Sequence, residues 1–265
     1  MDRLALGRIL QFGDSMLPTG AFAFSGALEA AVQTRAVHDA ETLRQFVESA
    51  VEQAASGDAV GMAWALRAAR GAGTDSRAWA LLGAVDEALF VRKAPEEARA
   101  MLTRTGAKLA ELGAAVTASP LAARWLERIR AGATPGTSPV SMAVLFAAMG
   151  GAAAPATADG AGACATTAPG QNFRDGDSRQ DDLLVRDALI VHLYGVMTGI
   201  LNAALRLMRL THVETQSLLY RLAGRLDDLA ARAAAAPLEN MSAYAPMTDI
   251  LSAIHARAHV RLFMS

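Results

Sequence analysis

The chain has 265 residues, a formal net charge of −1, a hydrophobic fraction of 52% and an aromatic fraction of only 5%. A chain of this length can bury a substantial core, as one large domain or two small ones. Its near-neutral charge excludes a whole-chain electrostatic attraction to nucleic acid. Alanine and leucine, the strongest helix formers, dominate most of the sequence, so we expect an all-α protein.

The cysteine content and the N-terminal residues indicate the cellular compartment of the protein. Cys164 is the only cysteine, which excludes an intrachain disulfide and a thiolate cluster for a metal. Arg3 and Arg8 interrupt the N-terminal segment with no apolar core after them, so it does not read as a secretory signal. We therefore expect a cytoplasmic protein.

Apolar positions recur at helical spacing along the first half of the chain. Asp39 stands where an N-cap residue would accept hydrogen bonds from the first turn of a helix. Pro95, followed by two glutamates, is typical of a helix start. The pattern predicts helices at 40–55, 58–70, 75–91, about 95–112 and after Pro120, with a loop at 132–139.

Residues 150–182 differ from the rest of the chain, because Ala, Gly, Thr, Pro, Asp and Ser fill them and Phe173 is their only large apolar residue. Such a composition buries too little surface to offset the entropy of ordering. We interpret the segment as a flexible insertion between two parts of one helical domain, 1–149 and 183–265. The expected fold is a single-domain bundle of about ten helices.

Residues 188–205 contain no Asp, Glu, Lys or Arg, and 18 residues is the lower limit for a membrane-spanning helix. The central helix of a soluble bundle has the same composition, and no second such segment exists to pack with this one. We favour the soluble interpretation and leave a single-span membrane protein as an alternative.

Gly195 and Gly199 permit a close helix approach, most simply in ordinary packing, or else at a dimer seam. Further helices are expected at about 214–235 and 248–260.

Few polar residues could converge on a catalytic centre. His255 and His259 lie four apart on the last predicted helix, so both rings could project from one face and hold a metal. No acid lies between them, and we favour a solvated basic face beside Arg257 and Arg261. His192 is expected to be a hydrogen-bonded core residue. We thus predict no catalytic residue, cofactor or metal site; the alternative is a helical metal-binding enzyme or storage protein that uses His255 and His259.

The last five residues, Arg261 to Ser265, combine a cation with three large apolar side chains. Chain ends usually fray unless something holds them. An aromatic residue beside an arginine is typical of an interface hot spot. We interpret this segment as a docking tail that has little reason to be ordered in the free protein.

Several short segments, in order and position, resemble urease accessory protein F (UreF). They are LPTGAF at 17–22 followed by Ser25 and Leu28-Glu29, KAPEE at 93–97, LY at 193–194, NAA at 202–204, residues 210–216, Pro246 with Asp249-Ile250, His255, and RLFMS at 261–265. Each segment is weak alone, and together they cover most of the chain except the insertion. Phe24 and Ser138 stand where relatives often carry histidines.

The resemblance implies an all-α homodimer that is not an enzyme. Such a protein joins a UreD/UreH-type accessory protein, recruits a UreG-type GTPase and helps pass nickel to the urease apoprotein. It further implies that Phe22 and Arg261 serve recruitment of the GTPase and that the tail with Leu262 and Phe263 contacts the UreD-type partner.

Overall fold

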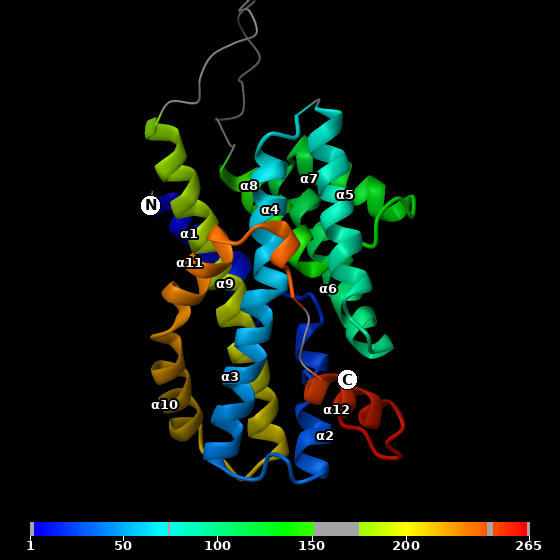
Figure 1. Cartoon of the computed structure of the whole chain (residues 1–265), viewed down its shortest axis with the longest axis vertical. Coiled ribbons are helices and arrows are strands. Elements are labelled where there is room, and N and C mark those ends of the chain that lie inside the picture. Colours follow the sequence, from blue (N-terminus) through cyan, green and yellow to red (C-terminus); the bar gives the residue numbers. More distant parts are fainter. Residues whose placement is uncertain (1–2, 74, 151–174, 243–245, 264–265) are drawn as a thin grey trace, which may run out of the picture.

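The computed structural model describes residues 3–73, 75–150, 175–242 and 246–263, and these residues form helices and loops with no strand (Figure 1). The prediction of an all-α fold is confirmed. The α-helices are α1 (Arg3–Gly13), α2 (Leu28–Gln33), α3 (Ala40–Ser56), α4 (Asp58–Arg70), α5 (Ser76–Val91), α6 (Glu96–Thr117), α7 (Pro120–Arg130), α8 (Ser138–Gly150), α9 (Asp175–Leu207), α10 (His212–Ala223), α11 (Leu226–Ala235) and α12 (Pro246–Ala256). Two 3-10 helices, η1 (Ala21–Ala23) and η2 (Leu238–Asn240), complete the described elements.

Side-chain caps fix several helix starts at the expected positions. The Asp39 carboxylate accepts the amide of Thr42 at 2.8 Å, and the Thr42 hydroxyl accepts the Asp39 amide, so α3 begins with a capping box. Thr211 and Glu214 form the same box at the start of α10. These caps satisfy amides that a first helical turn otherwise leaves unpaired.

The core forms around α4, which packs against α5, α8 and α9. Most residues of α4 are buried, and many of them are alanines, which allow neighbouring helices to approach closely. Leu66, Trp125 and Phe146 are among the side chains that are fully enclosed. A core built mainly from Ala, Leu, Val and Met agrees with the low aromatic content.

Asp86, a fully buried acid on α5, organises the loop between α7 and α8. Its carboxylate accepts hydrogen bonds from the hydroxyls of Thr134 and Thr137, both at 2.5 Å, and from the amides of Gly136 and Thr137, at 2.7 and 2.8 Å. The same loop lies directly against Gly106 of α6, where a Cβ atom would come 2.1 Å from the Gly136 carbonyl oxygen. One buried charge thus holds a loop against a helix that must carry glycine.

Several predicted boundaries are wrong. The expected helix at 214–235 is two helices, because the chain turns at Gly224 and Arg225, and both α10 and α11 pack against α9. α6 continues to Thr117, and α12 ends at Ala256 rather than near Val260. Residues 175–182 belong to α9, so this helix extends into the segment that we predicted as a flexible insertion. Its remainder, 151–174, lies outside the described residues.

Within the described helices, the segment Leu184–Leu207 of α9 is long and apolar enough to cross a membrane. The core helix of a soluble protein meets the same criterion, and α9 packs against α3, α4 and α11. Its buried side chains include Leu189, Leu193 and Met197. Packing inside the bundle accounts for the apolar composition of the α9 face that carries these side chains.

On the opposite face of α9, the described residues leave an exposed stretch. Tyr194, Gly195 and Gly199 are exposed, and a Cβ atom added at either glycine would meet no heavy atom within 4 Å in the described structure. The two glycines therefore do not serve close packing among the described residues, contrary to our simpler expectation.

Candidate functional site

The C-terminal tail, defined here as residues 257–263, lies beside α2 and α12 (Figure 1). Phe263 is only 6% exposed and belongs to the hydrophobic core, whereas Leu262 is 54% exposed. Our expectation of a tail with no internal support was wrong. The free chain already holds the tail and buries one of its two apolar anchors.

Glu29, in the first turn of α2, holds this tail through its backbone. One carboxylate oxygen, Oε1, accepts the Leu262 amide at 2.7 Å, and the other, Oε2, accepts the Phe263 amide at 2.9 Å. Gln33, one turn further along α2, donates to the Val260 carbonyl at 3.2 Å. The short helix α2 therefore binds residues 260–263 of the tail.

His255 of α12 lies at the centre of this site and is completely buried. Its Nε2 lies 3.0 Å from Glu29 Oε2, and its Nδ1 lies 2.9 Å from Glu97 Oε2. The second oxygen of Glu97 accepts Arg261 Nη1 at 2.9 Å. We call these four residues, Glu29, Glu97, His255 and Arg261, the tail clasp. The interpretation of His255 as part of a solvated basic face is wrong.

Burial raises the pKa of the Glu29 carboxyl, but hydrogen bonds from the Leu262 and Phe263 amides and from His255 outweigh that effect and hold the pKa below its ordinary value. Glu29 is therefore ionised at neutral pH. Hydrogen bonds to a charged acceptor are about twice as strong as neutral ones, which suits a site that must hold a chain end.

The Phe263 ring connects the tail to a further helix. The guanidinium of Arg206, in the last turn of α9, lies 4.6 Å from the centroid of the ring. A cation at this distance is attracted to the face of an aromatic ring. The tail thus joins α2, α6, α9 and α12.

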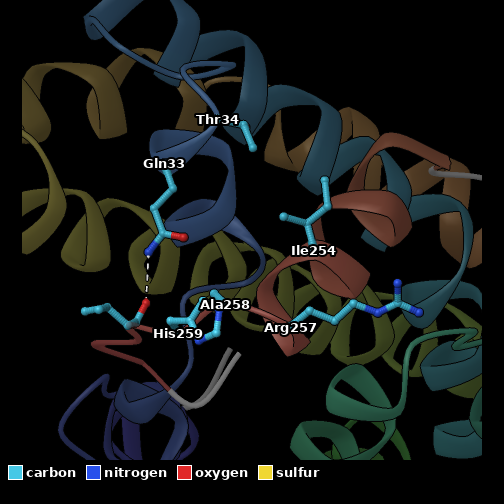
Figure 2. A pocket seen from close by; sticks show the side chains of 7 residues that line it. Gln33, Thr34, Ile254, Arg257, Ala258 and His259 are labelled. Atoms are coloured by element: carbon cyan, nitrogen blue, oxygen red, sulfur yellow. Dashed lines mark hydrogen bonds between the residues drawn. The ribbon is translucent and has the colours of Figure 1, made fainter.

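A shallow groove of about 500 Å³ lies between α2 and the end of α12. Figure 2 shows Gln33 and Thr34 on one side and Ile254, Arg257 and His259 on the other. Val260, at its edge, is exposed. Because α12 ends at Ala256, His259 does not share a helical face with His255.

The metal-binding alternative has no support from this geometry. Both ring nitrogens of His255 are engaged by carboxylates. Among the described residues, no group of three or more His, Cys, Asp or Glu side chains is arranged to hold a metal ion.

His192 was expected to form a hydrogen bond in the core. Its Nε2 atom is buried, but it has no hydrogen-bond partner among the described residues. Burial lowers the pKa of this histidine, with the Asp58 carboxylate opposing the shift. A neutral His192 therefore contributes to packing in α9.

Phe22 lies on η1 and is 73% exposed. Gly20, which precedes η1, has a φ of 79°, a left-handed conformation that glycine adopts without strain. Phe24 turns inward and is buried. The structure groups Arg261, Leu262 and Phe263 in one segment, and no described hydrogen bond, ion pair or ring contact joins Phe22 to them.

Comparison with known proteins identifies the family. The family model described as UreF matches residues 37–161 and 179–223. The chain belongs to the UreF family. It is 41% identical over 257 residues to urease accessory protein UreF 2 of Brucella canis, which covers 97% of this chain and 90% of that protein. It is also 41% identical over 263 residues to urease accessory protein UreF of Yersinia pestis, with 99% of each chain covered.

In the sequence, Glu29 and Glu97 stand out only as parts of the UreF pattern, and their pairing with His255 is not predicted from it. Each acid lies in the first turn of its helix, where a negative charge is ordinary. The sequence signal that could have pointed to the tail clasp is the presence of a histidine, an arginine and two acids in segments that match the UreF pattern.

Proposed function

We propose that this UreF-family chain acts by binding rather than by catalysis. It bridges a UreD/UreH-type accessory protein and a UreG-type GTPase during maturation of the urease metallocentre in the cytoplasm, where nickel is the cargo delivered to the urease apoprotein. The family assignment and the printed names of the relatives support this role. The observation that carries it is the presentation of the tail, which is held by its backbone while Leu262 stays exposed.

The tail is the proposed contact with the UreD/UreH-type protein. Val260 lines the groove between α2 and the end of α12, and both Val260 and Leu262 are exposed, so a partner can bury both without unfolding the bundle. Fully burying an aliphatic side chain contributes about 1.5–3 kcal/mol relative to leaving it exposed. Phe263 contributes indirectly, because its burial fixes the position of Leu262.

Phe22 and Arg261 are the proposed contacts for the GTPase. Phe22 is a large apolar side chain that nothing in the described chain covers, and Arg261 retains donors beyond its bond to Glu97. Aromatic and arginine side chains dominate the binding energy of many interfaces.

The uncovered face of α9 is the proposed contact between two copies of the chain. Gly195 and Gly199 leave room for a helix of a second copy, and Tyr194 offers an aromatic contact beside them. A Gly195→Leu substitution should convert the dimer to a monomer in analytical ultracentrifugation while helicity is unchanged. A dimer that persists would place the seam elsewhere.

Co-purification tests the proposed bridging. Leu262→Ala should reduce capture of the UreD/UreH-type partner more than tenfold, whereas Phe22→Ala and Arg261→Ala should reduce recruitment of the GTPase. Tyr220→Ala is a matched control, because Tyr220 is 85% exposed on α10, on the other side of the molecule from α12 in Figure 1. Normal assembly and urease maturation by all three variants would contradict the proposal.

A further inference from the structure

The contacts of the two ring nitrogens of His255 indicate how many protons the ring carries. Each ring nitrogen lies at hydrogen-bonding distance from a carboxylate oxygen, at 2.9 and 3.0 Å. An ionised carboxylate only accepts hydrogen bonds, and a neutral imidazole carries one N–H. One of the two contacts would therefore place a nitrogen lone pair against an oxygen lone pair. Two protons on the ring make both contacts hydrogen bonds.

The charges around the ring lead to the same conclusion. α2 contributes Glu29, α6 contributes Glu97, and the tail contributes Arg261, which is bonded to Glu97. Two carboxylates and one partly exposed guanidinium leave one negative charge uncompensated beside the buried His255 ring, which is costly. An imidazolium at position 255 makes the tail clasp neutral.

Among the described residues, the recorded hydrogen bonds and ion pairs of the His255 ring are those to Glu29 and Glu97. Asp249, the acid at the start of α12, has a pKa raised by burial, which the Lys93 cation opposes. Arg99 of α6 donates to the carbonyls of Lys93 and Ala94, and Arg206 of α9 lies over Phe263. Glu96 is exposed at the start of α6, and Arg257, on the C-terminal side of α12, lines the groove. The charge balance of the tail clasp therefore depends on its own four members.

We propose that His255 is a positioning residue for the docking tail and that it works as a buried imidazolium whose second proton keeps the clasp closed. This inference rests on the proposed function of the tail as the docking element. With both protons, His255 bonds Glu29 and Glu97 at once, and Glu29 remains aligned for the Leu262 and Phe263 amides. Loss of one proton as the pH rises leaves one carboxylate without its donor, and the tail is released.

The first experiment determines the protonation of His255 in the isolated full-length chain. Nitrogen chemical shifts of the labelled histidine rings should show both nitrogens of His255 protonated under conditions in which the Leu262 and Phe263 amides are protected from hydrogen exchange. An unprotonated ring nitrogen while those amides remain protected would overturn the proposal.

The second experiment uses Glu97→Gln, which changes the required proton count and keeps the shape. The amide oxygen of glutamine can accept Arg261, and its NH₂ group can donate to Nδ1 of a neutral His255. In the wild type, the protection factors of the Leu262 and Phe263 amides should fall at least tenfold as the pH rises and His255 loses its proton. In Glu97→Gln the clasp should stay closed over the same range, with a neutral His255. Identical pH behaviour of the two proteins would overturn the proposal.

His255→Gln should expose both tail amides in the isolated chain, and His259→Gln is the matched control, because His259 lies in the groove outside the clasp. Persistent protection of the tail amides in folded His255→Gln would contradict the proposal. These measurements need no partner protein. Their outcome is therefore separate from that of co-purification, which tests the proposed function itself.

Discussion

The Nε2 atom of His255 lies 3.0 Å from Oε2 of Glu29 and joins two residues that are 226 positions apart in the chain. Both side chains are buried, and each would be costly to bury without the other. Removing either partner leaves the remaining polar group unsatisfied, a loss larger than the net contribution of one hydrogen bond. The contacts of Glu29 and His255 should therefore be lost together.

Acid should open the clasp as well. The pKa of Glu29 lies below its ordinary value because the Leu262 and Phe263 amides and His255 favour the charged form over the effect of burial. A group with a lowered folded-state pKa contributes stability above its ordinary pKa, and this contribution is lost as the pH falls through the lowered value. Amide proton shifts of Leu262 and Phe263 should report this transition in the wild type. Glu29→Gln should lack it, and an unchanged titration in that variant would assign the transition to another group.

Local signals were sufficient to predict much of the bundle. Asp39 precedes an amphipathic stretch, so its role as the cap of α3 could be read from neighbouring residues. The bounds of α4 are also those expected from the spacing of its apolar residues. Such features depend on residues within a few turns of one another.

The tail clasp could not be predicted in this way. His255 looks like one member of a basic segment, and only the tertiary fold brings Glu29 and Glu97 to its ring. The apolar period also continues across Gly224, which concealed the turn between α10 and α11. The roles of Phe22 and Leu262 as contact residues stay predictions.

Two helical glycines should respond in opposite ways to an added methyl group. Gly106→Ala should lower the free energy of unfolding by about 1–3 kcal/mol, because the new Cβ would overlap the backbone of the loop at Gly136. Gly195→Ala should raise it by about 0.5–1 kcal/mol, since the position is open and alanine favours the helix. Urea denaturation at low protein concentration, where the chain is a monomer, measures both. Equal effects would contradict the packing described here.

Asp86→Ala should be among the most destabilising polar substitutions in the chain. It leaves the Thr134 and Thr137 hydroxyls and the loop amides without their buried acceptor. We expect a loss of about 3–5 kcal/mol, the range for removing one partner of a buried charged network. Asp75→Ala is the control, because Asp75 is an exposed helix cap and its loss should cost about 1 kcal/mol. Similar midpoints of unfolding for the two variants would refute the assigned role of Asp86.

Nickel should bind the isolated chain with a dissociation constant of about 1 μM or higher, which corresponds to a binding free energy no more favourable than about −8 kcal/mol. The reason is that both nitrogens of His255 are already engaged and His259 lies beyond the end of α12. Calorimetric titration measures the affinity. A tight site with one nickel per chain that disappears in both His255→Ala and His259→Ala would revive the metal-binding alternative.

Leu262 and Phe263 should have different roles, one in partner binding and the other in stability. Phe263→Ala removes a buried ring and its contact with Arg206, so the free energy of unfolding should fall by up to about 1.5–3 kcal/mol. Leu262→Ala should leave stability nearly unchanged, because Leu262 is half exposed, and should instead weaken capture of the UreD/UreH-type partner. Thermal unfolding and co-purification of the two variants provide the comparison. If Leu262→Ala destabilises the isolated chain as much as Phe263→Ala while partner capture is unaffected, the tail is an internal packing element and docking must occur elsewhere.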